Sequence, residues 1–244
     1  MAEGEENQQP GSSTVAKNPQ KNRKETIYQP LGEKHALQNR WALWYLKADR
    51  NRCWEDCLKQ LAVFETVEDF WSLYSNIQPC SALDWGSDYY LFKENIRPMW
   101  EDSSNVRGGR WLVVVEKRKR QQLLDHYWME LMMAMVGEQF EDSGELICGA
   151  VVNVRQKGDK VSLWTRDAEQ DNVNMRIGQI LKAKLTIPAT DTLRYEVHKD
   201  SSRRTSSMVK PRIVIPGIPE PPPSAKKKEK TGKDKENEAA KESQ

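Results

Sequence analysis

The sequence predicts an α+β domain, in which a mainly antiparallel sheet carries three helices on one face. Three observations predict it. Six segments have the alternating or continuous apolar pattern of strands, and three have the 3.6-residue period of helices. Short links join several consecutive strands, which favours antiparallel neighbours. The sequence contains no internal repeat that would indicate a solenoid.

The first expected strand, residues 40–46, has apolar side chains on both faces. A helix is expected to begin after Thr66, because Thr66 and Asp69 form a near capping box, and to end before Pro79. Apolar residues at helical spacing predict two further helices, at 123–140 and 172–185. The remaining strands are expected at 89–92, 110–116, 147–155, 160–165 and 193–198.

The 244-residue chain is long enough for one domain with tails. Residues 1–34 and 219–244 contain few large apolar side chains, so we expect both to be disordered. The domain between them, residues 35–218, has 26 basic and 25 acidic side chains. A protein that coats long nucleic acids usually has a strong basic excess. Any nucleic-acid contact is therefore expected to be local.

The N-terminal sequence lacks the apolar region of a signal peptide, and no run approaches the roughly 18–20 apolar residues of a membrane span. We therefore expect no membrane association. Cys53 and Cys57 form a CxxxC pair, but the three histidines are scattered, so we expect structural thiols, no metal and no cofactor. With Cys80 and Cys148, these thiols favour a reducing compartment, cytoplasmic or nuclear.

Residues 147–165 have the pattern of a β-hairpin. If residues 156–159 form its loop, three pairs lie opposite each other on one face: Arg155 and Lys160, Asn153 and Ser162, and Val151 and Trp164. Like charges in opposed positions destabilise a sheet. A solvated basic hairpin is one interpretation of Arg155, Lys157 and Lys160. Because Trp164 shares their face, we favour an anion site, most simply for phosphates.

A second cluster, Trp100-Glu101-Asp102, falls in an expected loop before the strand at 110–116. A loop tryptophan offers a ring face, and a carboxylate can accept the two parallel N–H groups of a guanine edge. Trp100 with Glu101 could therefore stack on and recognise guanine, although Trp100 as a core residue beside solvated acids remains an alternative. Trp54, in another polar loop, could form a second aromatic wall.

A series of motifs runs through the domain. They are Asn39-Arg40-Trp41-Ala42-Leu43-Trp44, Thr66-Val67-Glu68-Asp69-Phe70-Trp71, Pro98-Met99-Trp100-Glu101-Asp102, Gly108-Gly109-Arg110-Trp111, Cys148-Gly149-Ala150-Val151-Val152-Asn153-Val154-Arg155 and Lys157-Gly158-Asp159-Lys160. From His35 to about Ile215, the chain resembles the messenger-RNA cap-binding proteins of the eukaryotic translation initiation factor 4E family. The resemblance implies one curved sheet with helices on the convex face and the ligand on the concave side.

It also implies a function: binding the 7-methylguanosine 5′ cap and recruiting the message for translation initiation. Trp54 and Trp100 would enclose the methylated base, and Glu101 would accept its N–H groups. Trp164 would touch the N7 methyl group. The triphosphate would be held by a basic set comprising Arg155, Lys160, Lys157 and Arg110.

The resemblance further implies a second site on the helical surface, where a Tyr-x4-Leu-apolar peptide from a scaffold initiation factor or a 4E-binding repressor would dock. The corresponding residues are His35, Val67, Trp71, Met129, Glu130 and Met133. Ala36 stands where the family usually has proline, and Met129 and Met133 where it has leucine. Methionine adapts its shape readily, so we expect an intact groove with altered partner preference.

Ser207 resembles a phosphorylated position of the family, and a phosphate there could pair with Lys157. The chain is expected to be a monomer within a cytoplasmic cap-binding complex, with nuclear or granule pools also compatible. A cap-binding repressor isoform is the main alternative. An enzyme is disfavoured because Glu101 and Asp102 are sequence neighbours rather than a facing pair. A generic single-strand RNA binder would need an aromatic central-strand motif that this sequence lacks.

Overall fold

The protein is represented by a computed structural model that describes residues 32–49, 51–202 and 209–216. Apart from residues 32–34, the expected tail at 1–34 lies outside the described residues. The tail at 219–244 and Ser207 also lie outside them. Among the described helices, none combines the length and apolar composition needed to cross a bilayer.

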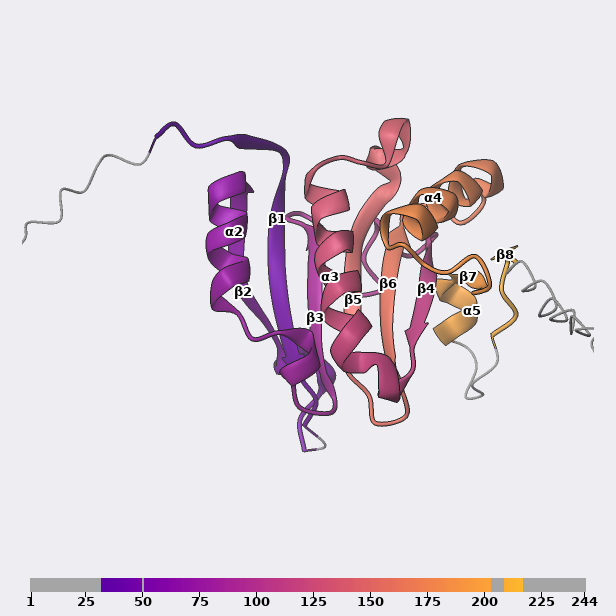
Figure 1. The fold of residues 1–244 in the computed structure, drawn as a ribbon, viewed down its shortest axis with the longest axis horizontal. Coiled ribbons are helices and arrows are strands. Elements are labelled where there is room, and N and C mark those ends of the chain that lie inside the picture. The colour runs from indigo at the N-terminus through magenta and orange to yellow at the C-terminus, as the bar shows by residue number, and fades with distance from the viewer. Residues whose placement is uncertain (1–31, 50, 203–208, 217–244) are drawn as a thin grey trace, which may run out of the picture. The chain divides into compact units, whose positions relative to one another are not determined.

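The described strands form one curved sheet in which every neighbouring pair is antiparallel (Figure 1). Its order is β2-β1-β3-β5-β6-β4-β7-β8. The strands are β1 (Ala36–Lys47), β2 (Leu58–Thr66), β3 (Ser87–Lys93), β4 (Gly109–Val115), β5 (Ile147–Asn153), β6 (Asp159–Thr165), β7 (Leu193–Val197) and β8 (Ile213–Ile215).

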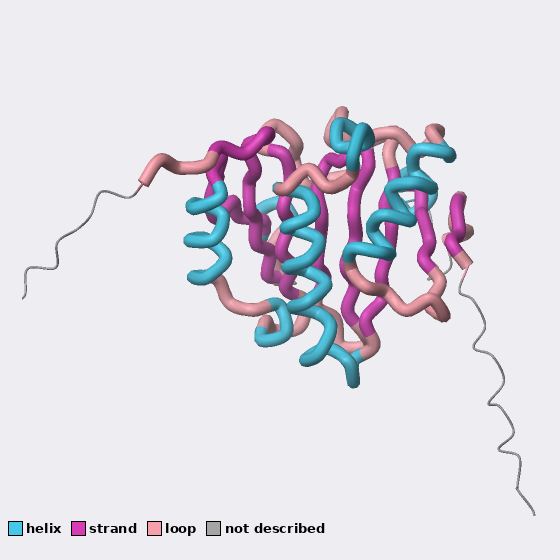
Figure 2. Tube along the Cα trace, turned by 45° about the horizontal axis from the view of Figure 1, so that its top comes forward, coloured by secondary structure: helices cyan, strands magenta, loops and turns pink. Residues whose placement is uncertain are grey.

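Three long helices cover one face of this sheet, as predicted (Figures 1 and 2). They are α2 (Val67–Asn76), α3 (Arg120–Val136) and α4 (Asp171–Lys184). The short helices are α1 (Trp54–Cys57) and α5 (His198–Ser202), and single 3₁₀ segments occur at Cys80–Ala82, Lys117–Lys119 and Glu141–Leu146. We call the sheet face away from the three long helices the concave face.

The start of α2 follows the predicted capping pattern. The Thr66 hydroxyl accepts a hydrogen bond from the backbone N–H of Asp69 at 3.2 Å. Phe70 is buried against Phe64, whereas Trp71, the next residue, is 41% exposed. The capped turn therefore directs Phe70 into the core and leaves Trp71 at the surface.

The main core lies between the sheet and the long helices. Trp111 is fully buried there, and its Nε1 donates to the Asn174 carbonyl of α4 at 3.0 Å. Helix α4 approaches the sheet closely because Gly178 faces this ring: a Cβ added to Gly178 would lie 2.3 Å from Cζ2 of Trp111. A smaller apolar cluster, including Tyr90, Phe92 and Trp164, lies on the concave face.

The predicted register of the hairpin is wrong by two residues. Lys160 lies opposite Asn153, not Arg155; Ser162 lies opposite Val151; and Trp164 lies opposite Gly149. The ladder ends early because Arg155 lies in the turn: its N–H donates to the Asp159 carboxylate at 2.9 Å instead of a β6 carbonyl, and its carbonyl accepts from the Gly158 N–H at 3.3 Å. Side chains alternate with a period of two, so this shift leaves each residue on its predicted face.

Strands β2 and β8 were not predicted. β2 is an edge strand in which Leu58, Lys59, Gln60 and Leu61 are half-buried or exposed, so its sequence lacks the alternation that marks an inner strand. β8 has only three residues and lies at the other edge. The helix expected at 123–140 begins earlier, at Arg120, and ends at Val136.

Candidate nucleotide-binding site

The concave face is organised in three rows of side chains that cross the sheet. Directly opposed residues of antiparallel strands point to the same side, so the strand registers define each row. The first row is Ala42, Phe92, Gly149, Trp164, Arg110 and Glu196. The second is Trp44, Tyr90, Val151, Ser162, Leu112, Arg194 and Val214, and the third is Leu46, Asp88, Asn153, Lys160 and Val114.

A cavity of about 390 Å³ lies over the middle of these rows, within the size range of small-ligand sites. Its lining combines rows of the sheet with two loops: Trp54, Glu55, Tyr90, Pro98, Met99, Trp100, Glu101, Arg110, Val151, Asn153 and Trp164. The structure thus brings Trp54, Trp100, Glu101, Trp164 and Arg110 together. Arg155, Lys157 and Lys160 lie outside the lining.

The two tryptophans of the loops are the exposed aromatic groups of the cavity. Trp54 is 41% exposed and opens helix α1 rather than standing in an irregular loop, whereas Trp100 is 40% exposed in the turn between β3 and β4. The core interpretation of Trp100 is therefore wrong. A flat ligand that enters the cavity can cover both indole rings.

The turn that carries Trp100 and Glu101 is held by its own polar residues. The Asp102 carboxylate accepts from the backbone N–H groups of Arg97 at 3.1 Å and Ser104 at 2.8 Å. The buried Asn105 side chain donates to the carbonyls of Arg97 and Met99 at 3.0 and 2.9 Å. Asp102 is thus a structural residue of the turn. Glu101 is exposed, and no described residue donates a hydrogen bond to it.

Trp164 forms part of the cavity wall and is only 8% exposed. Its ring meets Phe92 edge-on at 5.4 Å and lies 4.1 Å from the ring of His198. Burial, assisted by the charge of Arg110, lowers the pKa of His198 to about 3. A neutral imidazole therefore supports Trp164 at physiological pH.

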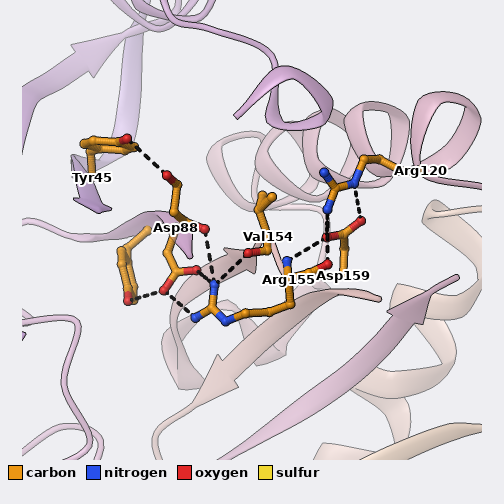
Figure 3. A network of polar contacts seen from close by, with 8 residues as sticks. Tyr45, Asp88, Arg120, Val154, Arg155 and Asp159 are labelled. Atoms are coloured by element: carbon orange, nitrogen blue, oxygen red, sulfur yellow. Dashed lines mark hydrogen bonds and ion pairs between the residues drawn. The ribbon is translucent and has the colours of Figure 1, made fainter. Parts of the chain in front are cut away.

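Arg155 lies beside the cavity and is fixed by the buried carboxylate of Asp88 (Figure 3). Its Nη1 and Nη2 donate to the two Asp88 oxygens at 2.5 and 3.0 Å, and Tyr90 donates to Asp88 at 3.0 Å. The hydrogen bonds to Asp88 raise the pKa of Arg155 above its usual value. The guanidinium is consequently oriented before any ligand arrives.

The hairpin loop is fixed from the other side by α3. Asp159, which is fully buried, accepts from the backbone N–H of Arg155 at 2.9 Å and from Nε of Arg120 at 2.7 Å (Figure 3). A second nitrogen of Arg120 also bonds to Asp159 and reaches the Arg155 carbonyl at 3.3 Å. The loop that carries Arg155 is therefore connected to the first residue of α3.

The remaining basic residues differ in their pairing. Arg110 is paired with Glu196, with Nη2 3.0 Å from Oε2. Lys157 and Lys160 are exposed, and neither has an ion-pair partner among the described residues. One oriented arginine, Arg110, therefore lines the cavity, and the neighbouring hairpin carries the oriented Arg155 and two lysines without such partners.

Sequence reasoning did not identify Asp88, Asp159, Arg120 or Glu196 as supporting residues. The signal for Asp88 was an acidic residue within an apolar strand, Ser87–Lys93, whose inward and outward positions are nearly all buried. For the other three, the partner lies on a distant element, so no local pattern could indicate the pair.

The residues predicted to bind a partner lie on the helical side of the sheet. Val67 and Trp71 are exposed on α2, and Met129, Glu130 and Met133 are partly exposed on α3, which runs beside α2 (Figures 1 and 2). His35 precedes β1, and its backbone N–H and Nδ1 contact the Glu68 carboxylate at 2.9 and 2.6 Å. This contact lowers the pKa of Glu68.

Residues 36–213 match the family model described as Eukaryotic initiation factor 4E. The chain is 74% identical over 186 residues to Eukaryotic translation initiation factor 4E-3 of Caenorhabditis elegans, covering 75% of this chain and 74% of that protein. The factor 4E-3 of Ascaris suum, solved with an m2,2,7G cap, is 74% identical with a TM-score of 0.71, over 75% of this chain and 99% of that one. A complex of the Caenorhabditis elegans factor with the 4E-binding protein Mextli and a cap analog is 69% identical with a TM-score of 0.70, over 75% and 100%. This chain therefore belongs to the eukaryotic initiation factor 4E family.

Proposed function

We propose that this protein binds the 7-methylguanosine 5′ cap of messenger RNA in the cavity between Trp54 and Trp100. The observation that carries the proposal is that two exposed indoles and the Glu101 carboxylate border one cavity. Methylation at N7 makes guanine cationic, so stacking against indole gains a cation–π contribution. The Glu101 carboxylate would accept the N1 and N2 hydrogens, and these charge-assisted bonds favour guanine over other bases.

The triphosphate would leave the cavity toward the hairpin. Arg155 and Arg110 are already oriented by Asp88 and Glu196, so their guanidinium groups lose little freedom on binding. Lys160 and Lys157 would supply the uncompensated positive charge. Trp164, at the cavity wall, would contact the N7 methyl group.

The α2–α3 surface would recruit the message through a partner. The Caenorhabditis elegans relative has been solved in complex with the 4E-binding protein Mextli, which supports binding of such a partner by this chain. Trp71, Val67 and the methionines of α3 offer an apolar surface beside the Glu130 carboxylate. We propose a helical Tyr-x4-Leu-apolar segment of a scaffold factor or a repressor as its ligand.

We propose binding without chemical turnover. Both carboxylate oxygens of Asp102 accept hydrogen bonds within the turn that carries Trp100, so Glu101 and Glu55 are the acidic groups of the cavity that can contact a ligand. Release of 7-methylguanosine diphosphate from capped RNA by the pure protein would contradict this part of the proposal.

Retention on immobilised 7-methyl-GTP tests the cap site. The protein should be retained on the resin. It should elute with free 7-methyl-GTP but not with GTP at the same concentration. Trp100→Leu should lose about 1–3 kcal/mol of binding, the value of one base stack. Trp71→Leu, on the opposite face, is the matched control and should be retained as the wild type. Equal elution by both nucleotides would reject the cap proposal.

The same two variants test the partner surface with labelled peptides. Trp71→Leu should lower the affinity for a Tyr-x4-Leu-apolar peptide, and Trp100→Leu should leave that affinity unchanged. Peptides from scaffold and repressor proteins, compared side by side, separate an initiation factor from a repressor isoform. If the peptide binds both variants with equal affinity, the α2–α3 surface is not its docking site.

A further inference from the structure

The concave face continues beyond the cavity as a strip of exposed or partly exposed side chains across β6, β4, β7 and β8. We define the β4–β8 strip by its five residues: Lys160, Val114, Leu112, Arg194 and Val214. Val114 is 62% exposed and Val214 is 40% exposed, whereas apolar residues of β3 and β5 on the same face, such as Phe92 and Val151, are buried. We propose that this strip binds the first nucleotides of a capped RNA, downstream of the triphosphate. The inference rests on the proposed cap site.

The strip is continuous with the cavity. Asn153 lines the cavity, Lys160 lies directly opposite Asn153, and Val114 lies directly opposite Lys160. A chain that leaves the cavity over Asn153 therefore meets a cation first and then an apolar side chain. Arg194 follows one strand further, opposite Leu112.

The charges of the strip suit a phosphodiester chain. Arg194 and Lys160 are exposed, and neither has an ion-pair partner among the described residues. On the strands of the strip, the acidic residue of the concave rows is Glu196, which pairs with Arg110. Asp88 of β3, in the same row as Lys160, is engaged by Arg155. The strip thus presents two cations without an unpaired carboxylate between them.

The spacing suits a short single strand rather than a single phosphate. Lys160 on β6 and Arg194 on β7 are separated by β4, so the two strands lie about 10 Å apart. Between them, Leu112 and Val114 offer aliphatic surface and no side-chain hydrogen-bonding group. Bases can pack on such a surface without being recognised individually, so binding should tolerate any sequence after the cap.

A length series of ligands tests the strip: 7-methyl-GTP, a capped dinucleotide and a capped pentanucleotide, with the uncapped pentanucleotide as background. The wild type should bind the capped pentanucleotide more tightly than 7-methyl-GTP. Arg194→Ala should remove about twofold to fivefold of pentanucleotide affinity and leave 7-methyl-GTP unchanged. For Arg194→Ala, the slope of log affinity against log salt concentration should become less steep by about 0.7, the value for one phosphate contact to a single strand.

Two further variants make the outcome decisive. Val114→Glu adds an exposed carboxylate without disturbing the core, and should also lower only the pentanucleotide affinity. Lys184→Ala, which removes an exposed cation from α4 on the other side of the sheet, is the matched control for net charge.

Each other result overturns the inference. If the pentanucleotide binds no tighter than 7-methyl-GTP, or if Lys184→Ala matches Arg194→Ala, the strip does not bind RNA. If Arg194→Ala loses affinity for 7-methyl-GTP and for the pentanucleotide equally, Arg194 acts on the cavity through its neighbours. Failure of 7-methyl-GTP itself to bind the wild type would instead reject the cap site, and the strip with it.

Discussion

Arg155 donates from both Nη atoms to the carboxylate of Asp88, at 2.5 Å to Oδ1 and 3.0 Å to Oδ2. Asp88 is buried in β3, whereas Arg155 is 43% exposed at the margin of the cavity. The buried partner therefore fixes the orientation of an arginine that remains accessible to a ligand. This geometry suits recognition of an anion by a guanidinium group that is already in place.

Asp88→Asn should weaken binding of 7-methyl-GTP by about threefold to tenfold, because Arg155 loses a charged hydrogen-bond partner and its fixed orientation. The positive charge released by the substitution is screened by solvent at this half-exposed site. Binding of 7-methylguanosine, which has no phosphate, should be unchanged. Calorimetric titration with both ligands separates the two effects, and equal losses for both would show that Asp88 supports the cavity rather than Arg155.

Arg120→Leu should destabilise the fold by about 3–5 kcal/mol, because it leaves the fully buried Asp159 carboxylate without its ionic partner. Arg212→Leu is the matched control. Arg212 pairs with Asp171 at the surface, where such pairs contribute less than about 1 kcal/mol. Urea unfolding of the two variants measures the difference. If both variants lose a similarly small part of the unfolding free energy, Asp159 is stabilised by other groups.

His198 should make the fold sensitive to acid. Its pKa is about 3 when folded, well below its unfolded value of 6.5, so only the unfolded chain takes up this proton between those values. Stability should therefore fall as the pH drops from about 6.5 toward 3, by at most about 1.4 kcal/mol per pH unit. In His198→Phe this part of the dependence should disappear.

His126→Phe serves as the control for that measurement, because His126 is half-exposed on α3. The unfolding free energy of His126→Phe should follow the pH dependence of the wild type more closely than the unfolding free energy of His198→Phe does. Parallel curves for the wild type and His198→Phe between pH 4 and 6 would mean that His198 is not held neutral by burial.

Gly178→Ala should destabilise the protein although alanine is the better helix former by about 1 kcal/mol. The added Cβ would lie 2.3 Å from the buried Trp111 ring, and overpacking of this kind costs about 1–3 kcal/mol or more. Gln179→Ala, at an exposed position of the same helix, should change stability by less than about 0.5 kcal/mol. Thermal unfolding compares them, and a Gly178→Ala protein as stable as Gln179→Ala would contradict the close approach of α4.

The sequence was most informative where a residue's neighbours along the chain determine its structure. The cap at Thr66, the three long helices and the inner strands follow local patterns, and all are confirmed. Strand β2 was missed because an edge strand has little buried surface to impose alternation. The hairpin register was wrong because the Asp159 side chain, held by Arg120 of α3, accepts the Arg155 N–H and ends the ladder.

The same distinction holds for the candidate site. Trp100 and Glu101 could be identified from their own loop, and the structure places both at the cavity. The acids that orient the arginines could not be identified, because Asp88 and Glu196 meet Arg155 and Arg110 only through the pairing of strands distant in sequence. The residues proposed to touch a ligand left a local pattern, whereas the residues that position the arginines did not.

The most direct test of the central claim is a titration of intrinsic tryptophan fluorescence with 7-methyl-GTP and with GTP. The wild type should show strong quenching and tight binding with 7-methyl-GTP, and weak quenching with GTP. Glu101→Gln should lose most of the 7-methyl-GTP affinity, whereas Glu55→Gln, in the same cavity, should keep it. If the wild type binds both nucleotides alike, or if the two variants behave alike, then Trp54, Trp100 and Glu101 do not form a cap-recognition site.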